Sequence, residues 1–300
     1  MKQSLRHSIS LFAIKDQLKI YIALFALKLR IKPPDSFNSL FYKCMAYVKA
    51  HEAGVNFGKA QNDLIKATLV VNSKTIAVYL RSNSSDLQVL ESVLLHDEYK
   101  PAVKQLLDTT KKTNIRQIID AGGNIGLTSI YFHCFFPDAH FTIIEPDERN
   151  FSLLKKNIDI NGVKNKLLLK NALWVNNEPL VIEHLFRDGK EWSLTVGQKV
   201  ADSKNQKRTE LLGITLKEIC ERNNNPPIDL FKIDIEGAER FLFSNSEFLG
   251  TINSCVGNLV IEIHDEFKIR DIINSEMHEM NFTKEEYGDI TLFAKQYSLA

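Results

Sequence analysis

The 300-residue sequence has few cysteines and no closely spaced pair of them. The four that occur are Cys44, Cys134, Cys220 and Cys255, and no C-x-x-C motif is present. This spacing suits neither a disulfide framework nor a zinc site. We therefore expect reduced, buried thiols and a protein of the cytoplasm.

The sequence also lacks an apolar run long enough to cross a bilayer. The longest such run, Ile20–Leu27, lies between Lys19 and Lys28, whereas a spanning helix needs about 20 residues. Lys15-Asp16 interrupts the apolar segment and no A-x-A site follows, which argues against a signal peptide.

The sequence has almost no net charge, which gives no reason to expect a nucleic-acid partner. The formal charge is +1, but residues 1–32 carry seven lysines and arginines and only Asp16. That segment is therefore +6 and the remainder −5. The simpler interpretation is a helical cap on the main domain. The alternative is a basic helix that makes peripheral contact with anionic lipid, at the inner face of a membrane.

The first part of the chain predicts two helices and then a hairpin. Helical spacing of apolar residues covers 9–31 and 37–54, with Pro33-Pro34 between them. Alternating apolar residues on both sides of a polar turn predict a β-hairpin over 68–81, and a short helix follows at 87–96. We predict a helical N-terminal extension over 1–65 and a second domain over 66–300.

Strand and helix patterns alternate in the core of the second domain, residues 114–296. This order predicts an α/β fold: a Rossmann-like sheet, mostly parallel with an antiparallel last strand, and helices on both faces. The expected strands are 115–120, 141–145, 167–170, 228–234, 255–263, 283–287 and 290–295, and the expected helices are 125–136, 148–160, one from about 238, and 270–280.

A glycine-rich turn follows the first of these strands, with the sequence Asp120-Ala-Gly-Gly-Asn-Ile-Gly126. Glycine is needed where backbone approaches a ligand closely, and ligands of open α/β sheets bind at the carboxyl ends of strands. The next strand ends in Glu145-Pro146, and an acid there can accept hydrogen bonds from a ribose diol. Together these features indicate a cofactor that contains adenosine.

The spacing of the glycines favours a sulfonium cofactor over a dinucleotide. Residues 122–127 match G-x-G-x-x-G at only one of its three glycine positions. The acidic Asp120 would repel a pyrophosphate and attract the ammonium group of a methionyl moiety. An NAD(P)-dependent oxidoreductase therefore remains only the less favoured alternative.

These motifs resemble those of the FkbM family of class I methyltransferases. The resemblance rests on the glycine loop, on Glu145-Pro146 and on Lys232-Ile-Asp-Ile-Glu-Gly-Ala-Glu239, and it covers roughly residues 75–296. It implies S-adenosyl-L-methionine as the cofactor. For the methionyl moiety it implies Asp120, Gly122, Gly123, Asn124 and Gly126. For the ribose it implies Glu145 and Pro146, and for the adenine Asn171, Ala172 and Trp174. Trp174 could equally be a plain core residue.

Acidic residues and one histidine are expected at the same edge of the sheet. Asp234 ends the fourth strand and His264 follows the fifth, with Glu236 and Glu239 just after Asp234. Asp234 could bind the cofactor, accept the acceptor's proton or cap a helix, and Glu236, Glu239 and His264 are the other catalytic candidates. A metal held by Asp234 and Glu262 is conceivable, but the spacing does not require one.

The resemblance also implies transfer to a hydroxyl oxygen of a glycan or another small or secondary metabolite. No N-P-P-Y-like run, typical of amino methylation, is present. The segment 178–208, with Trp192, could shape the acceptor pocket or form an edge hairpin. A non-catalytic adaptor that keeps the fold and docks through residues 1–32 is the alternative from another functional class.

Overall fold

A computed structural model describes residues 2–82, 84–109, 115–183, 195–198, 210–224 and 226–296. The chain forms two compact units, residues 1–97 and 98–300. The sequence places the boundary near residue 65, whereas the structure places the hairpin in the first unit with the helices. Among the described residues, no helix combines the length and hydropathy needed to cross a membrane.

The first unit begins with three helices, α1 (Lys2–Ser10), α2 (Ile14–Lys28) and α3 (Asp35–Glu52). The single helix predicted over 9–31 is wrong, because the chain breaks between α1 and α2. Ala13 is extended there, and two side chains bond to backbone on either side of it: Ser10 Oγ donates to the His7 carbonyl and Gln17 Nε2 to the Phe12 carbonyl. The break expected at Pro33-Pro34 is present, since α3 begins directly after Pro34.

An antiparallel sheet of β1 (Asn56–Phe57), β2 (Leu64–Val71) and β3 (Lys74–Arg81) follows. Asn72 and Ser73 both have positive φ, as a two-residue type I′ hairpin turn requires. Next come α4 (Asp86–Leu90) and the π-helix η1 (Glu91–Leu95). The buried Asp86 accepts two hydrogen bonds from the Arg81 guanidinium, at 2.7 and 2.9 Å, and so joins β3 to α4.

The second unit is built on a seven-stranded sheet with the order β13-β14-β12-β11-β4-β5-β6. Its strands are β4 (Gln117–Ala121), β5 (His140–Ile144), β6 (Lys166–Leu169), β11 (Leu230–Ile233), β12 (Asn258–Glu262), β13 (Phe282–Tyr287) and β14 (Ile290–Lys295). Within the described part of this sheet β14 runs antiparallel to both of its neighbours, β12 and β13, and every other neighbouring pair of strands is parallel. The predicted α/β class is confirmed.

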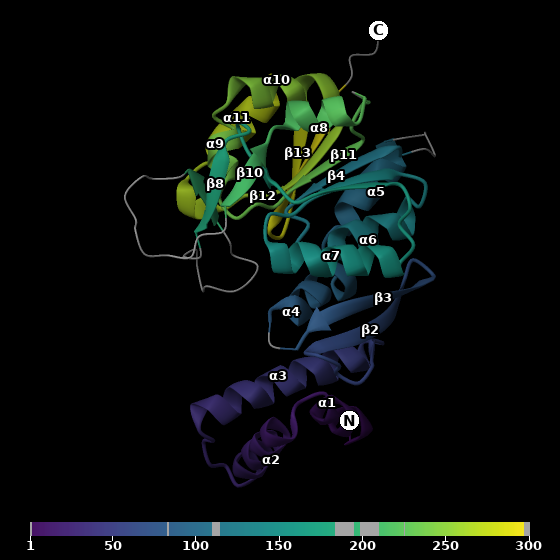
Figure 1. Ribbon diagram of the computed structural model, residues 1–300, viewed down its shortest axis with the longest axis vertical. Coiled ribbons are helices and arrows are strands. Elements are labelled where there is room, and N and C mark those ends of the chain that lie inside the picture. The colour runs from purple at the N-terminus through teal and green to yellow at the C-terminus, as the bar shows by residue number, and fades with distance from the viewer. Residues whose placement is uncertain are drawn as a thin grey trace. The chain divides into compact units, whose positions relative to one another are not determined.

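Helices cover both faces of this sheet. One side carries α5 (Lys100–Thr109), α6 (Leu127–Phe135) and α7 (Glu148–Ile160), and the other carries α8 (Leu216–Arg222), α10 (Ser246–Cys255) and α11 (Arg270–Glu279) (Figure 1). The short α9 (Glu239–Leu242) and the 3-10 helix η2 (Asp265–Phe267) follow β11 and β12. The apolar pattern of the sequence does not predict α5 or α8.

A smaller sheet has the order β7-β10-β8-β9, formed by β7 (Ala172–Leu173), β8 (Pro179–Glu183), β9 (Thr195–Gln198) and β10 (Glu210–Ile214). The antiparallel pair of β8 and β9 lies in the segment 178–208, where an edge hairpin was one of two interpretations. Trp192 lies outside the described residues.

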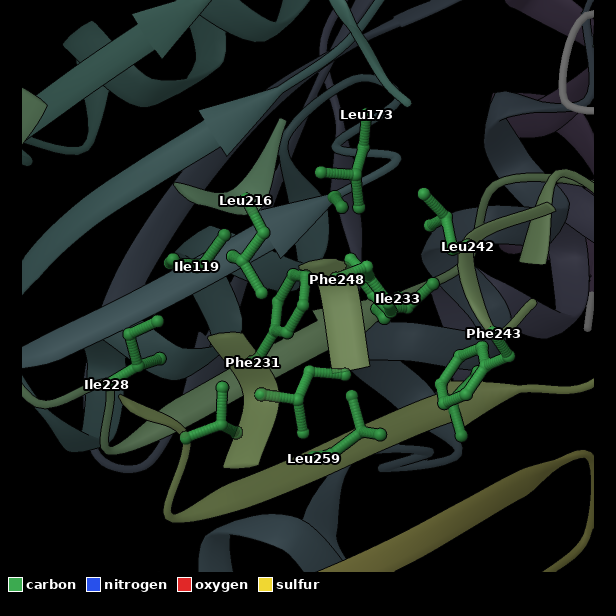
Figure 2. Close-up of a cluster of buried hydrophobic side chains, with 14 of the residues drawn as sticks. Ile119, Leu173, Leu216, Ile228, Phe231, Ile233, Leu242, Phe243, Phe248 and Leu259 are labelled. Atoms are coloured by element: carbon green, nitrogen blue, oxygen red, sulfur yellow. The ribbon is translucent and has the colours of Figure 1, made fainter. Parts of the chain in front are cut away.

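Buried aliphatic and aromatic side chains fill the space between the large sheet and α8, α10 and α11. Figure 2 shows Phe231 from β11 and Leu259 from β12 together with Leu216 of α8 and Phe248 of α10. Strands buried on both faces need continuous apolar sequence. Two charged residues break that rule: Asp120 of β4 and Lys232 in the middle of β11 are both buried.

Candidate active site at the carboxyl edge of the sheet

The loop between β4 and α6 makes a very close approach to the end of β11. Gly122 has φ +80°, and a Cβ built on it would lie 1.7 Å from the Asp234 carbonyl oxygen. No larger residue fits there without moving one of the two loops. The glycine loop and the acidic segment that begins at Asp234 are therefore packed directly against each other.

The side chain of Lys232 contacts both of these loops. Its ammonium group donates to the Gly122 carbonyl at 2.8 Å and lies 3.2 Å from Asp120 Oδ1 and 3.7 Å from Asp234 Oδ2. Burial alone would lower the pKa of Lys232, but the two carboxylates outweigh it and raise that pKa above its usual value. The buried lysine is therefore charged.

Asp120 is fully buried. Its carboxylate accepts a hydrogen bond from Ser129 Oγ at 2.6 Å and faces Lys232 across the register of β4 and β11. The sequence predicts an Asp120 that receives the ammonium group of a cofactor. In the structure that carboxylate already has a protein ammonium as its partner.

Glu145 follows β5 and connects to the glycine loop. Its carboxylate accepts hydrogen bonds from the backbone N–H groups of Asn124 and Asp147, each at 2.8 Å. Burial raises the pKa of Glu145 to about 8, although both backbone donors act to lower it. Pro146 is half-buried, and Asp147 caps the N-terminus of α7. The carboxylate is thus fixed in orientation beside Asn124.

The segment expected beside an adenine lies after β6. Asn171 Nδ2 donates to the Leu212 carbonyl at 3.1 Å, and Ala172 is buried in β7. Trp174 is 2% exposed, and its ring centroid lies 4.9 Å from that of Phe241. Its Nε1 is buried without a hydrogen-bond partner among the described residues. Trp174 thus packs as a core residue but keeps one buried donor unused.

The acids after β11 and β12 surround His264. Its Nδ1 lies 3.1 Å from Glu239 Oε1, and its Nε2 lies 3.3 Å from Glu236 Oε2 and 3.8 Å from Glu262 Oε1. The side chains of His264 and Glu239 are fully buried, whereas those of Asp234 and Glu262 keep 28% and 25% of their surface. A substrate can therefore reach Asp234 and Glu262 more readily than His264.

The charges in this cluster shift the pKa values of its members. Burial would lower the pKa of His264, but contact with Glu236 and Glu239 raises it to about 11. Burial, followed by the nearby Asp234, raises the pKa of Glu262 to about 8. Glu98, at the start of the second unit, has a raised pKa for the same two reasons, and no sequence motif marks it. A charged His264 thus offsets part of the negative charge.

Three groups of this cluster are close enough to share one cation. Asp234, Glu262 and His264 each offer a ligand atom, and these atoms lie within 4.8 Å of one another. Carboxylate oxygens and an imidazole nitrogen suit several divalent metals. However, a protonated His264 cannot coordinate a metal, so such binding would first require the loss of its proton.

A family model described as the methyltransferase FkbM domain matches residues 120–291, more than half of the chain. The chain belongs to the FkbM methyltransferase family. The match includes the glycine loop, Glu145 and the acids around His264. The family expected from the sequence motifs is therefore confirmed.

The curated relative that this FkbM-family chain matches is distant in sequence. Methyltransferase 1 of Beauveria bassiana (strain ARSEF 2860) is 24% identical over 136 residues, which are 41% of this chain and 55% of that protein. The chain thus spans about half the length of this curated relative.

Similarity to solved structures is low in both sequence and superposition. A putative caffeoyl-CoA O-methyltransferase from Staphylococcus aureus is 13% identical with a TM-score of 0.41, covering 70% of this chain and 91% of that one. Magnesium protoporphyrin IX methyltransferase from Synechocystis PCC 6803, solved with bound SAM, is 12% identical with a TM-score of 0.38, covering 67% and 79%. Neither likeness bears on the acceptor.

The raised pKa of Glu145 predicts how stability depends on pH. Between the usual value of 4.5 and about 8, folded Glu145 holds a proton that unfolded Glu145 has released. The folded state therefore binds more protons in this window, and its free energy of unfolding should fall as pH rises from 5 to 8. Glu145→Gln removes this contribution, so its slope should be smaller by up to about 1.4 kcal/mol per pH unit.

Urea unfolding at several pH values measures these slopes. Glu145→Gln will be less stable overall because its amide NH₂ faces a backbone donor. The comparison therefore uses the pH dependence of the free energy of unfolding and not its absolute value. Glu279→Gln, at an exposed position of α11, is the control and should keep the wild-type slope. Equal slopes for Glu145→Gln and wild type would show that Glu145 is ionised across this range.

Proposed function

We propose that this FkbM-family chain is an S-adenosyl-L-methionine-dependent O-methyltransferase that acts on a hydroxyl group of a glycan or another small metabolite. The observation that carries the proposal is the hydrogen bond from the Asn124 N–H to Glu145. This hydrogen bond connects Glu145, an acid suited to a ribose diol, to the glycine loop. The close approach of Gly122 packs the same loop against Asp234. The parts of an adenosine site and a set of acids thus meet at one sheet edge.

The residues present fit such a cofactor in their chemistry. Glu145 offers two fixed carboxyl oxygens to the ribose hydroxyls, and Pro146 follows it directly. Gly122, Gly123, Asn124 and Gly126 present backbone to the methionyl part, and Asp120 acts through Lys232, which holds this loop. Asn171, Ala172 and Trp174 serve the adenine side, where the unpaired Trp174 Nε1 offers a donor.

Asp234 is the group we assign as proton acceptor. Its carboxylate is partly exposed, so an acceptor hydroxyl can reach it, and it lies 3.7 Å from the Lys232 ammonium. The cofactor, when bound, supplies a methyl group on a positively charged sulfur. With the cofactor bound, Asp234 would accept the proton of the acceptor hydroxyl as that oxygen is methylated, and the site would add to the rate by holding the acceptor in position for transfer.

Glu236, Glu239 and His264 have supporting parts in this proposal. Glu239 is buried and accepts hydrogen bonds from His264 Nδ1 and from the Ile235 N–H. It therefore fixes the orientation of the imidazole and of the backbone just after Asp234. The positive charge of His264 faces Glu236 and Glu262 and limits the repulsion between these acids and Asp234. His264 and Glu239 are positioning residues.

Cofactor binding is the first test of this proposal. We expect S-adenosylmethionine and S-adenosylhomocysteine to bind in calorimetric titration and NADH not to bind. Glu145→Ala should weaken both complexes at least about tenfold, because it removes the carboxylate that receives the ribose hydroxyls. Glu279→Ala is the matched surface control. Binding of NADH alone would favour an oxidoreductase, and no binding of any of the three compounds would favour a non-catalytic adaptor.

The role of Asp234 predicts a separation of rate from affinity. In an assay that transfers a labelled methyl group from S-adenosylmethionine to a panel of sugars and small alcohols, Asp234→Asn should lower the rate about 100-fold or more. Its affinity for S-adenosylhomocysteine should change by less than about threefold. The product should be an ether, stable in mild alkali that cleaves methyl esters.

Glu236→Gln provides the comparison within the same cluster and should lower the rate much less. An equal loss of rate and affinity in Asp234→Asn would instead place Asp234 on the cofactor. An unchanged rate would exclude it as the proton acceptor.

A further inference from the structure

Helix α2 has two apolar faces, and the first unit covers only one of them. Ile20 and Ala23 are fully buried, and Ile20 and Leu24 belong to a cluster with Ile9 and Cys44 from the neighbouring helices. The opposite side is apolar as well, but it is exposed. Its members, which we call the α2 stripe, are Ile14, Leu18, Tyr21, Ile22 and Phe25 of α2 and Leu29 directly after it, each between 43% and 85% exposed.

The spacing of the α2 stripe places its members on a single face. They follow one another at intervals of four, three, one, three and four residues. At 3.6 residues per turn, this spacing places all six side chains on the same side of the helix. Single exposed apolar residues are common on protein surfaces, but a continuous stripe along a whole helix indicates a binding surface. At about 1.5 Å per residue the helix is roughly 22 Å long, so the stripe runs along one side for that length.

Lysines border the α2 stripe on both sides. At 100° per residue, Lys15 and Lys19 follow one edge of the stripe and Lys28 lies at the other. Long lysine side chains can extend their ammonium groups to lipid headgroups while their methylene groups remain near apolar surface. An apolar face bordered by lysines is the arrangement of a helix that lies in the plane of a membrane interface.

We propose that the α2 stripe docks on the surface of an anionic lipid bilayer. Charge complementarity selects this occupant over a second copy of the chain. Two stripes packed face to face would bring their bordering lysines together, and Asp16, the one acid in residues 1–32, already pairs with Lys19 at 3.1 Å. Anionic headgroups instead satisfy the +6 charge of residues 1–32, while the acyl region accepts Phe25 and Leu18.

Cosedimentation of the full chain with vesicles tests this surface. We expect binding to vesicles of equal phosphatidylglycerol and phosphatidylcholine, and much weaker binding to phosphatidylcholine alone. The double variant Leu18→Glu/Phe25→Glu should reduce partitioning to the anionic vesicles at least about tenfold. Lys15→Gln/Lys28→Gln should weaken it about fivefold for each lysine removed and reduce the preference for anionic lipid.

The matched control is Tyr42→Glu/Val70→Glu, which adds the same charge at two exposed apolar positions of the first unit outside α2. It should keep wild-type partitioning, and circular dichroism should show all variants folded. Equal binding by Leu18→Glu/Phe25→Glu and wild type would overturn the proposal, as would no binding by wild type. A dimer in sedimentation velocity that only the α2 variant abolishes would identify a second copy as the occupant and would also overturn it.

Discussion

A buried ammonium group holds together the edge of the sheet on which the proposed site depends. Lys232 sits in the middle of β11, where its neighbours are apolar, and it lies between Asp120 of β4 and Asp234 just past β11. Taking these charges out of water is costly unless each is paired and hydrogen-bonded. The Gly122 carbonyl completes the set, so the charge arrangement and the path of the glycine loop depend on each other.

The other parts of the site follow from that edge. With the glycine loop fixed against Asp234, the Asn124 N–H points to Glu145 and holds its carboxylate in place. Glu239 in turn fixes the backbone beyond Asp234, because its carboxylate accepts hydrogen bonds from the Ile235 N–H and from His264 Nδ1. Two carboxylates that the sequence alone would assign to chemistry thus have different parts: Glu239 supports the backbone, whereas Asp234 remains accessible.

The sequence predicts the large sheet well, because its strands and helices alternate with clear apolar patterns and end in glycine or acidic turns. It also predicts which residues gather at the carboxyl edge of this sheet, because residues that follow parallel strands meet there. The sequence does not predict which of these residues contact each other. The contact of Asp120 with Lys232 depends on the register of two strands that are more than 100 residues apart. A lone lysine within Leu-Phe-Lys-Ile was the available signal. The break between α1 and α2 falls at residues 11–13, where no proline or glycine marks it and the apolar periodicity continues.

Hydrogen–deuterium exchange with and without S-adenosylhomocysteine tests the central claim most directly, that three loops after β4, β5 and β11 form one cofactor site. The account predicts slower exchange in peptides that cover 121–126, 145–147 and 234–239, with no change in β2 and β3 of the first unit. Binding that leaves the exchange of all three loops unchanged would contradict it.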